Sequence, residues 1–474
     1  MESRPHVLVF PFPAQGHMIP LLDLTHTLAS HGLSLTVLTT PQNQSLLNPL
    51  LHTASAEGLR IQPLIIPFPP TQGIPPGCEN TGQLPALHLI PLFMYSFKEL
   101  AQPIEDWFHQ QKKSSDGFGP PVCIISDFFL GWTQNTAAKL GIRRIVFHPS
   151  GAFAVSIIYS LWKYMPHEQV SSDNDAVYIP DLPHPVSFPK SQISPLLRRY
   201  KVLDTIFEFI RYNMDLNVES WGTLINTFYD LEAVYIDNLH RVVSGRPVWS
   251  VGPLLPPAVL DAEGTNMIER GKPTSIKESV CLQWLESQKE KSVIYICFGS
   301  HAFFSNKQNQ EMAAGLEASE ESFIWVIRDP PSSMPADEYG VLPQGFEERT
   351  KGRGLVIRGW APQLLILSHP SVGGFLTHCG WNSTLESITS GVPLITWPMT
   401  ADQYYNAVLV IEYLKVGIRF CEGAATVPNR DDLRIAVKRL MGREGEEMKR
   451  AEELMRAGKR AVQEGGSSSK NMED

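Results

Sequence analysis

The sequence predicts an α/β protein built from two doubly wound domains with parallel sheets. The same succession of an apolar run, a glycine-containing turn, a helical pattern and a second apolar run occurs near residue 5 and again near residue 290. Such a succession is the parallel βαβ unit, because two parallel strands need a crossover between them. The 474 residues allow roughly two to four domains of about 100–200 residues each.

The first βαβ unit places a histidine after its opening strand. The apolar run HVLVFPFP is expected to be a buried strand, and the turn AQGH follows it. In MIPLLDLTHTLASHG, Leu21, Leu24 and Leu28 recur at helical spacing, and Gly32 stands where a C-cap is expected. LSLTVLTT is typical of the next buried strand. His17 is therefore expected at the carboxyl end of a strand, where open α/β sheets bind ligands.

The second series of units begins at SVIYICFGS and defines the domain boundaries. A helical pattern, NQEMAAGLEASE, and a strand pattern, SFIWVI, follow, and more units occur at GLVIRGW, GGFLTHCG, STLESITSG and VPLITWP. A stretch rich in proline, glycine and charge precedes it and is typical of a linker. We predict an N-terminal domain at 1–250, a linker at 251–275 and a C-terminal domain at 276–474. The tail is expected to be a charged, mostly exposed helix with a serine-rich stop.

Composition argues against several functions. The net charge of −9 and the lack of clustered positive charge argue against a nucleic-acid partner. The six cysteines form no CxxC pair, which fits a reducing compartment. The sequence has no Walker A motif and no GxGxxG. The N-terminus lacks a secretory pattern, and the most apolar stretch, LPALHLIPLFMYSF, is short and broken by prolines. We therefore expect a cytoplasmic protein with no membrane partner, and a monomer.

An acidic residue offers a partner for the histidine. Asp127 follows the apolar run PVCIIS, again at a strand's carboxyl end. A carboxylate there can orient an imidazole that takes a proton from a hydroxyl group. Asp127 can equally cap the helix that follows, and the residues alone leave both interpretations open. His17 is likewise open between a base, a metal ligand and a turn residue.

A possible anion site lies in THCGWNSTLESITSG. A strand ends there, and a helix is expected to start near Asn382 or Ser383. The unpaired N–H groups and the dipole of a helix N-terminus can hold a diphosphate, with His378 beside it. Ser383-x-x-Glu386 is also a capping box, so Glu386 either caps the helix or binds a nucleotide. Ser300 in the turn CFGS is a further possible phosphate donor.

The stretch from Trp360 to Gln403, WAPQLLILSHPSVGGFLTHCGWNSTLESITSGVPLITWPMTADQ, closely resembles the signature box of plant UDP-dependent glycosyltransferases. These enzymes form an inverting family with the GT-B fold, in which two Rossmann-like domains face each other across a cleft. FPAQGHMIP, SDFF, NTFYDLE, VGPLLP, CLQWLESQ and CFGS also match in order. The resemblance therefore covers nearly the whole chain.

The resemblance implies a role for each matching residue. His17 would be the general base and Asp127 its partner. The other residues would hold the donor. Uracil would stack on Trp360, with its edge at Ala361 and Gln363, and the ribose would bind Glu386. The diphosphate would bind His378, Asn382, Ser383 and Ser300, and the sugar would contact Trp381, Asp402 and Gln403. No metal or cofactor is expected, because the helix N-terminus and the histidine can neutralise the leaving group.

The implied reaction is an inverting O-glycosyl transfer from UDP-glucose to a flavonoid or simple phenolic, which gives a β-glucoside. Gln403 at the end of the box usually accompanies glucose in this family, and UDP-rhamnose, UDP-xylose and UDP-galactose remain alternatives. The acceptor would contact an aromatic wall, unless these side chains are simply core: Phe12, Phe93, Met94, Phe128, Phe129, Phe147 and Phe153.

Two other functions could use the same or a similar scaffold. A silent UDP-sugar or small-molecule binding protein would keep the box but lack His17 or Asp127, and an epimerase or hydrolase would lack an apolar acceptor pocket. Two positions depart from the family pattern. His301 follows the FGS turn where relatives often carry Gln or Thr, and the chain stops at SSSKNMED where relatives continue through a final helix. The chain is thus either clipped or has a short final helix.

Overall fold

The computed structural model describes residues 4–113, 117–256, 274–300, 302–328, 335, 338–442 and 445–474. Contacts divide the chain into two compact units. The first contains the described residues up to Leu255 together with Ala461–Asp474, and the second contains those from 274 to Arg460. The C-terminal stretch, which the sequence analysis assigned to the second domain, is thus part of the first unit. Most of the expected linker, at 257–273, and His301 lie outside the described residues.

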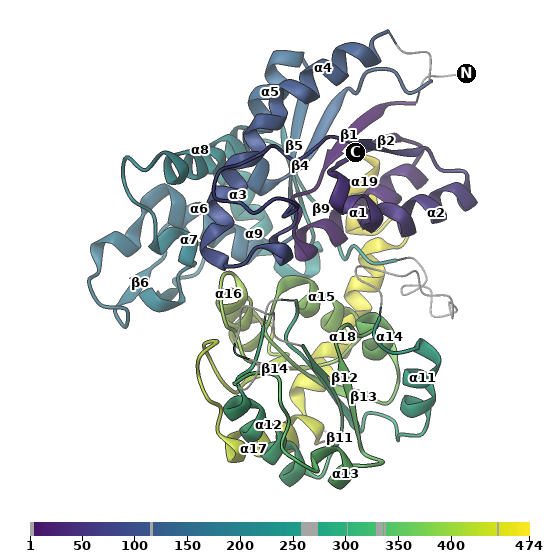
Figure 1. Cartoon of the computed structure of the whole chain (residues 1–474), viewed down its shortest axis with the longest axis vertical. Coiled ribbons are helices and arrows are strands. Elements are labelled where there is room, and N and C mark those ends of the chain that lie inside the picture. The colour runs from purple at the N-terminus through teal and green to yellow at the C-terminus, as the bar shows by residue number, and fades with distance from the viewer. Residues whose placement is uncertain are drawn as a thin grey trace. The chain divides into compact units, whose positions relative to one another are not determined.

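The first unit is built on a parallel sheet (Figure 1). In the described part of the chain its strand order is β3-β2-β1-β4-β5-β8-β9. The strands are β1 (His6–Phe10), β2 (Ser34–Thr39), β3 (Ile61–Ile65), β4 (Cys123–Asp127), β5 (Arg143–His148), β8 (Gly222–Ile225) and β9 (Val248–Ser250). The order reverses between β1 and β4, and such a switch point is where open α/β sheets bind ligands.

Helices accompany these strands, and a small antiparallel pair, β6 (Ala176–Tyr178) and β7 (Ser187–Pro189), extends the unit. The helices are α1 (Gln15–Ser30), α2 (Asn48–Glu57), α3 (Ile90–Ser96), α4 (Ala101–Gln111), α5 (Thr133–Leu140), α6 (Ala152–Tyr164), α7 (Pro195–Arg198), α8 (Thr205–Glu219) and α9 (Tyr229–Val242). Leu21 and Leu24 of α1 are fully buried against the strands, as their spacing predicts. The helix begins earlier than expected, so His17 lies in its first turn instead of the preceding loop.

The second unit repeats the arrangement. Its described strands are all parallel, in the order β12-β11-β10-β13-β14-β15, and the order reverses between β10 and β13. The strands are β10 (Val293–Cys297), β11 (Ser322–Ile327), β12 (Gly354–Arg358), β13 (Val372–Thr377), β14 (Leu394–Thr396) and β15 (Gly417–Arg419). The helices are α11 (Glu278–Glu286), α12 (Asn306–Ser319), α13 (Phe346–Arg349), α14 (Gln363–Ser368), α15 (Trp381–Thr389), α16 (Gln403–Val408), α17 (Arg430–Met441) and α18 (Glu446–Val462).

The C-terminal tail is more ordered than its composition suggests. Helix α18 buries a stripe of residues that includes Met448, Ala451 and Leu454, so it is amphipathic and only partly exposed. The expected serine-rich stop instead begins a further helix, α19 (Ser467–Glu473). Ser468 Oγ donates to the carbonyl of Gly252 at 2.5 Å, within the first unit. The tail therefore packs against the end of the first sheet.

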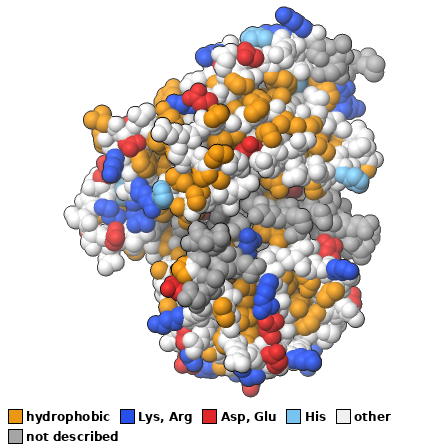
Figure 2. All heavy atoms as spheres, in the orientation of Figure 1, with side chains coloured by type: hydrophobic (Ala, Val, Ile, Leu, Met, Phe, Trp, Pro, Cys, Tyr) orange, Lys and Arg blue, Asp and Glu red, His pale blue; other side chains and the backbone are white. Residues whose placement is uncertain are grey.

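The surface carries charges of both signs. Figure 2 shows Lys and Arg interspersed with Asp and Glu over the visible face. Within the described ranges, no helix is both long and apolar enough to cross a bilayer. All six cysteines are free thiols.

Candidate active site

The switch point of the first sheet brings His17 and Asp127 together. His17 lies in the first turn of α1, after β1, and Asp127 is the last residue of the adjacent strand β4. Nδ1 of His17 is 2.8 Å from Oδ2 of Asp127. The Asp127 side chain is fully buried, whereas that of His17 is 21% exposed, so the imidazole is the member of the pair that solvent or a ligand reaches.

The pair has the geometry of a general base and its orienting acid. When Nδ1 donates its proton to the carboxylate, Nε2 keeps its lone pair and can accept a proton from a hydroxyl group. Oδ1 of Asp127 accepts from the backbone N–H of Phe129 at 2.9 Å. Both interpretations of Asp127 therefore hold, because one oxygen caps the turn and the other binds His17.

Aromatic rings enclose the imidazole. Phe128 and Phe129 stack beside it, with ring centroids 5.6 and 4.9 Å away, and Phe12 meets it edge-on at 5.7 Å. The expected aromatic wall is otherwise core, because Phe12, Phe93, Met94, Phe128, Phe147 and Phe153 are buried. Phe129 alone of that set is partly exposed. Sequence pattern could not separate wall from core, since both need apolar side chains.

In the second unit, two glycines make room for His378. A Cβ atom on Gly380 would lie 2.5 Å from Nε2 of His378, and one on Gly299 would lie 2.6 Å from the same atom. The imidazole thus lies where a side chain on either residue would meet it, and Gly299 also has a φ of 73°, which favours glycine. Cys379, between His378 and Gly380, has φ 63°, a strained value for a residue with a side chain. Such strain is often retained at functional sites.

Helix α15 presents its N-terminus beside this histidine, but not through the expected capping box. The helix begins at Trp381 with Gly380 as N-cap, so Asn382 and Ser383 belong to its first turn. Ser383 therefore cannot be the N-cap that a box with Glu386 requires. The N-cap residue, Gly380, has no side chain, and backbone N–H groups at a helix N-terminus are of the kind that can bind an anion.

Glu386 is instead tied to Gln363. Nε2 of Gln363 donates to Oε2 of Glu386 at 2.6 Å and lies 2.9 Å from Oγ of Ser383. The hydroxyl group of Tyr295 donates to Oε1 of Gln363 at 3.3 Å. Glu386 is buried at the second turn of α15, so this network fixes a carboxylate next to the helix N-terminus. A carboxylate so placed can accept hydrogen bonds from two adjacent hydroxyl groups.

Trp360 is held by its backbone and leaves its ring partly exposed. Its N–H donates to Oγ of Ser275 at 2.7 Å, and its carbonyl accepts from the N–H of Ser275 at 2.7 Å. The guanidinium group of Arg328 lies 5.6 Å from its ring centroid. Ala361, which follows, is buried in the core. Ser275 and Arg328 were not predicted as site residues, because neither belongs to the signature box.

The loop before α16 fixes Asp402 and Gln403. Oε1 of Gln403 accepts from the backbone N–H groups of Met399 and Thr400, at 3.0 and 3.1 Å. The side-chain oxygen of Gln403 is therefore occupied by hydrogen bonds within the turn, and Nε2 is the atom that can donate to a ligand. Oδ2 of Asp402 accepts from Nδ2 of Asn406 at 3.1 Å.

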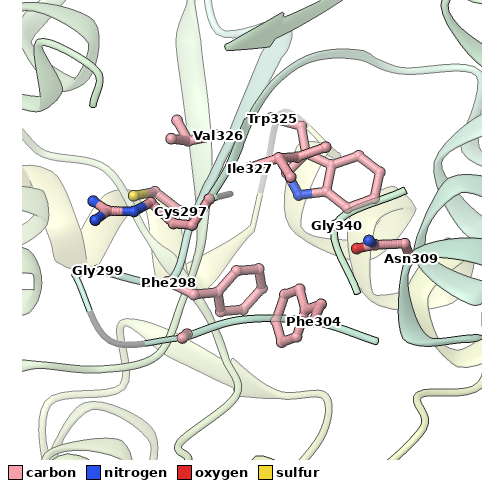
Figure 3. Close-up of a pocket in the computed structure, with 11 residues that line it drawn as sticks. Cys297, Phe298, Gly299, Phe304, Asn309, Trp325, Val326, Ile327 and Gly340 are labelled. Atoms are coloured by element: carbon pink, nitrogen blue, oxygen red, sulfur yellow. The ribbon is translucent and has the colours of Figure 1, made fainter. Parts of the chain in front are cut away.

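A pocket opens at the carboxyl ends of β10 and β11 (Figure 3). Phe298 and Phe304 meet edge to face in its wall, with centroids 4.6 Å apart. Gly299 lines the pocket and has φ 73°, and Ser300 follows it. The pocket thus adjoins the turn at which the sequence analysis placed a phosphate donor. Nowhere in the described ranges do three or more His, Cys, Asp or Glu side chains lie close enough to hold a metal ion.

Comparisons with known proteins agree with this geometry. The chain matches the UDP-glucoronosyl and UDP-glucosyl transferase family over residues 246–450 and the glycosyltransferase N-terminal domain over residues 5–256. UDP-glycosyltransferase 89B2 of Stevia rebaudiana is 45% identical over 470 residues, which cover 99% of this chain and 96% of that protein. Flavonol 3-O-glucosyltransferase UGT89B1 of Arabidopsis thaliana is 44% identical over 471 residues, 98% of this chain and 94% of that protein.

A solved structure extends the similarity to three dimensions. Arabidopsis thaliana UGT89C1 complexed with UDP-L-rhamnose aligns with a TM-score of 0.79 at 34% identity, covering 99% of this chain and 98% of that one. The two sheets, each with its own switch point, match the architecture of these enzymes. The chain therefore belongs to the plant UDP-glycosyltransferase family, which acts on flavonols and other phenolics, and is a glycosyltransferase of the GT-B fold.

Proposed function

We propose that this enzyme transfers glucose from UDP-glucose to a hydroxyl group of a flavonoid or simple phenolic, with inversion, to give a β-glucoside. The observation that carries the proposal is the 2.8 Å hydrogen bond between His17 and Asp127. It makes the exposed nitrogen of the imidazole a base. A binding protein needs no such base.

His17 supplies the proton transfer. Its Nε2 takes the proton of the acceptor hydroxyl group while that oxygen forms a bond to the anomeric carbon. The bond between this carbon and the diphosphate oxygen breaks, and its electron pair leaves with UDP. Asp127 stabilises the imidazolium that forms. A positioned base of this kind contributes about 10²–10⁴-fold to the rate. A single displacement inverts the anomeric centre.

The second unit supplies the leaving-group site. UDP departs as an anion, and preorganised donors stabilise the charge that develops on it. We assign this role to the first turn of α15, with Asn382 and Ser383, and to His378 and Ser300. We assign uracil stacking to Trp360, with Ala361 and Gln363 at its edge. Glu386 is assigned to the ribose hydroxyl groups, by exchange of its contact with Gln363.

The donor sugar is proposed to be glucose, bound by Trp381, Asp402 and Gln403. Because Oε1 of Gln403 is used by the turn, its Nε2 would donate to a sugar hydroxyl group. The relative UGT89B1 is named a glucosyltransferase, which supports glucose. The relative UGT89C1 is described with UDP-L-rhamnose, so UDP-rhamnose is the first competitor to test, followed by UDP-xylose and UDP-galactose.

The acceptor is proposed to be a flat phenol. Phe129 is partly exposed beside His17, and a planar ring can stack on it while its hydroxyl group reaches Nε2. The name of UGT89B1, a flavonol 3-O-glucosyltransferase, points to the same class. We further propose that the enzyme works without a metal, as a cytoplasmic monomer whose free cysteines stay reduced.

The test is a turnover assay with the purified full chain. UDP-glucose is offered with a panel of flavonols, coumarins and hydroxybenzoates in the presence of EDTA, and products are identified by mass shift. We expect addition of a hexose that is nearly lost in His17→Ala and retained in His31→Ala, an exposed histidine at the end of the same helix. Turnover with another UDP-sugar would replace glucose in the proposal. Binding of UDP without transfer to any acceptor would favour the silent binding protein.

A further inference from the structure

A buried arginine lies behind the catalytic pair. Arg144 is on β5, next to β4, and is 1% exposed. Its guanidinium group donates to four oxygens: Oγ of Ser126 at 3.0 Å, Oδ1 of Asn217 at 2.8 Å, Oγ of Ser220 at 2.7 Å and the carbonyl of Asp127 at 3.3 Å. All four acceptors are neutral. Over the described part of the chain, no carboxylate oxygen lies within the 4.0 Å of an ion pair with it.

This arrangement is unusual because an isolated charge is costly to bury. Burial lowers the pKa of Arg144 to about 10, yet the group remains protonated at neutral pH. The carboxylate of Asp127 lies on the neighbouring strand and is also fully buried. While His17 is neutral, this carboxylate has a hydrogen bond to the imidazole but no ion pair. The two buried charges have opposite signs, and the guanidinium group donates to the backbone carbonyl of Asp127. Each charge therefore lowers the free-energy cost of burying the other.

Three other titratable groups interact electrostatically with Arg144, and none of them is charged at neutral pH. They are His148 at the end of β5, Tyr159 on α6 and Cys123 on β4. Burial lowers the pKa of His148 to about 3 and raises that of Cys123 to about 12. Burial also raises the pKa of Tyr159, whose hydroxyl group pairs with His148 at 2.8 Å. Arg144 is thus a buried permanent cation that interacts electrostatically with Asp127, and none of these three groups adds a charge beside it.

Arg144 also fixes the turn that carries the carboxylate. Its contacts hold the side chain of Ser126 and the carbonyl of Asp127, and Asn217 in turn donates to the carbonyl of Phe128 at 2.7 Å. The segment whose rings stack on His17 is therefore held by the buried side chains of Arg144 and Asn217.

We propose that Arg144 is the buried counter-ion of the catalytic pair: it keeps Asp127 ionised and His17 neutral, so that the base is ready near neutral pH. Arg144 is a positioning residue, since it acts through Asp127 and touches no substrate. The inference rests on the proposed role of His17 as the base.

The test compares four variants by two measurements. Arg144→Gln removes the charge, and Arg144→Lys keeps it. Asn217→Asp places a carboxylate on the guanidinium group and neutralises it, whereas Asn217→Leu loses the same bond to Phe128 without adding a charge. The first measurement is the pH profile of kcat/KM, whose acid limb reports the free enzyme. The second is an NMR titration of ¹³C-labelled histidine, in which His17 is assigned by its absence in His17→Ala.

Without the positive charge of Arg144, the negative charge of Asp127 is no longer offset, so the pair of His17 and Asp127 binds a proton more tightly. We therefore expect both midpoints to move up by about one pH unit in Arg144→Gln and Asn217→Asp, and to stay near the wild-type value in Arg144→Lys and Asn217→Leu. If Arg144→Gln does not fold, the two Asn217 variants decide. Unchanged midpoints in folded Asn217→Asp, or equal shifts in Asn217→Leu, would overturn the proposal and leave Arg144 a structural residue. The NMR arm gives its answer even if the chain transfers no sugar, so failure of the proposed function remains distinguishable.

Discussion

The tight fit of His378 between two glycines gives a quantitative prediction for Gly380→Ala. The new Cβ would lie 2.5 Å from Nε2 of the imidazole, whereas ordinary contact begins at 3.4 Å, so the ring must move by about 0.9 Å. A shift of that size would break the hydrogen bond that we propose between His378 and the diphosphate. Because a hydrogen bond to a charged group contributes about 1.5–3 kcal/mol, the loss corresponds to about 10- to 150-fold in kcat/KM for UDP-glucose.

The same substitution has a small expected effect on stability. Gly380 has φ −59°, which alanine adopts without strain, and the only cost is a poorer N-cap for α15. About 1 kcal/mol is expected, or a fall in Tm of about 2–4 °C. A large loss of donor affinity with little loss of Tm therefore separates displacement of His378 from unfolding.

The assay is steady-state kinetics at varied UDP-glucose, with UDP binding measured by calorimetry. The control is the double variant with His378→Ala. If Gly380→Ala acts through the imidazole, it has no further effect once that ring is gone. An undiminished effect in the double variant, or unchanged donor kinetics in the single one, would refute the reasoning.

Three further predictions follow from the site and the core. Asp127→Asn should reduce kcat by about 10²–10⁴-fold with UDP affinity unchanged, because an amide that donates to Nδ1 leaves the proton on Nε2; unaltered turnover would contradict this. Trp360→Ala should weaken UDP binding, measured by calorimetry, by about 5- to 150-fold, since stacking of a base on an aromatic ring contributes about 1–3 kcal/mol; equal affinity would remove uracil from this ring. Burial lowers the pKa of His148 to about 3 in the folded state, against about 6.5 in the unfolded state. Its contribution to stability is therefore fully present above pH 6.5 and is lost as the pH falls toward 3. From pH 7 to 5 the free energy of unfolding should fall by about 2 kcal/mol more in wild type than in His148→Gln in urea titrations, and equal slopes would show that this residue is not the cause.

The sequence could predict much of the site because strand ends are easy to locate. His17 and Asp127 each follow an apolar run, and the parallel βαβ pattern brings such ends to one edge of a sheet. Their 2.8 Å contact follows from the order of β1 and β4, neighbours in the sheet although 110 residues separate the pair. The sequence could not exclude the capping role of Asp127, and the structure has both contacts.

Other features depend on packing between distant segments, which no local pattern records. Glu386 looked like half of a capping box, but α15 starts two residues before Ser383, and Gln363 takes the carboxylate. The sequence gives only a weak indication of Arg144: an arginine is unusual in a buried strand such as RRIVF. A short final helix was one of the two expected alternatives, but its packing on the first unit was not predicted, because the contact of Ser468 with Gly252 spans 216 residues.

The return of the last residues to the first unit affects how this enzyme can be recombined with its relatives. Residues Ala461–Asp474 pack with the first sheet, although they follow the second unit in the chain. A chimera that joins the first unit of one enzyme to the second unit of another therefore needs two junctions. The second would lie within α18, near Arg460, so that α19 travels with the sheet on which it docks. A chimera with a single exchange point would pair one enzyme's β9 with another's tail, where Asn471 donates to the carbonyl of Ser250 at 2.9 Å. The mismatch would fall on the unit that holds His17 and Asp127.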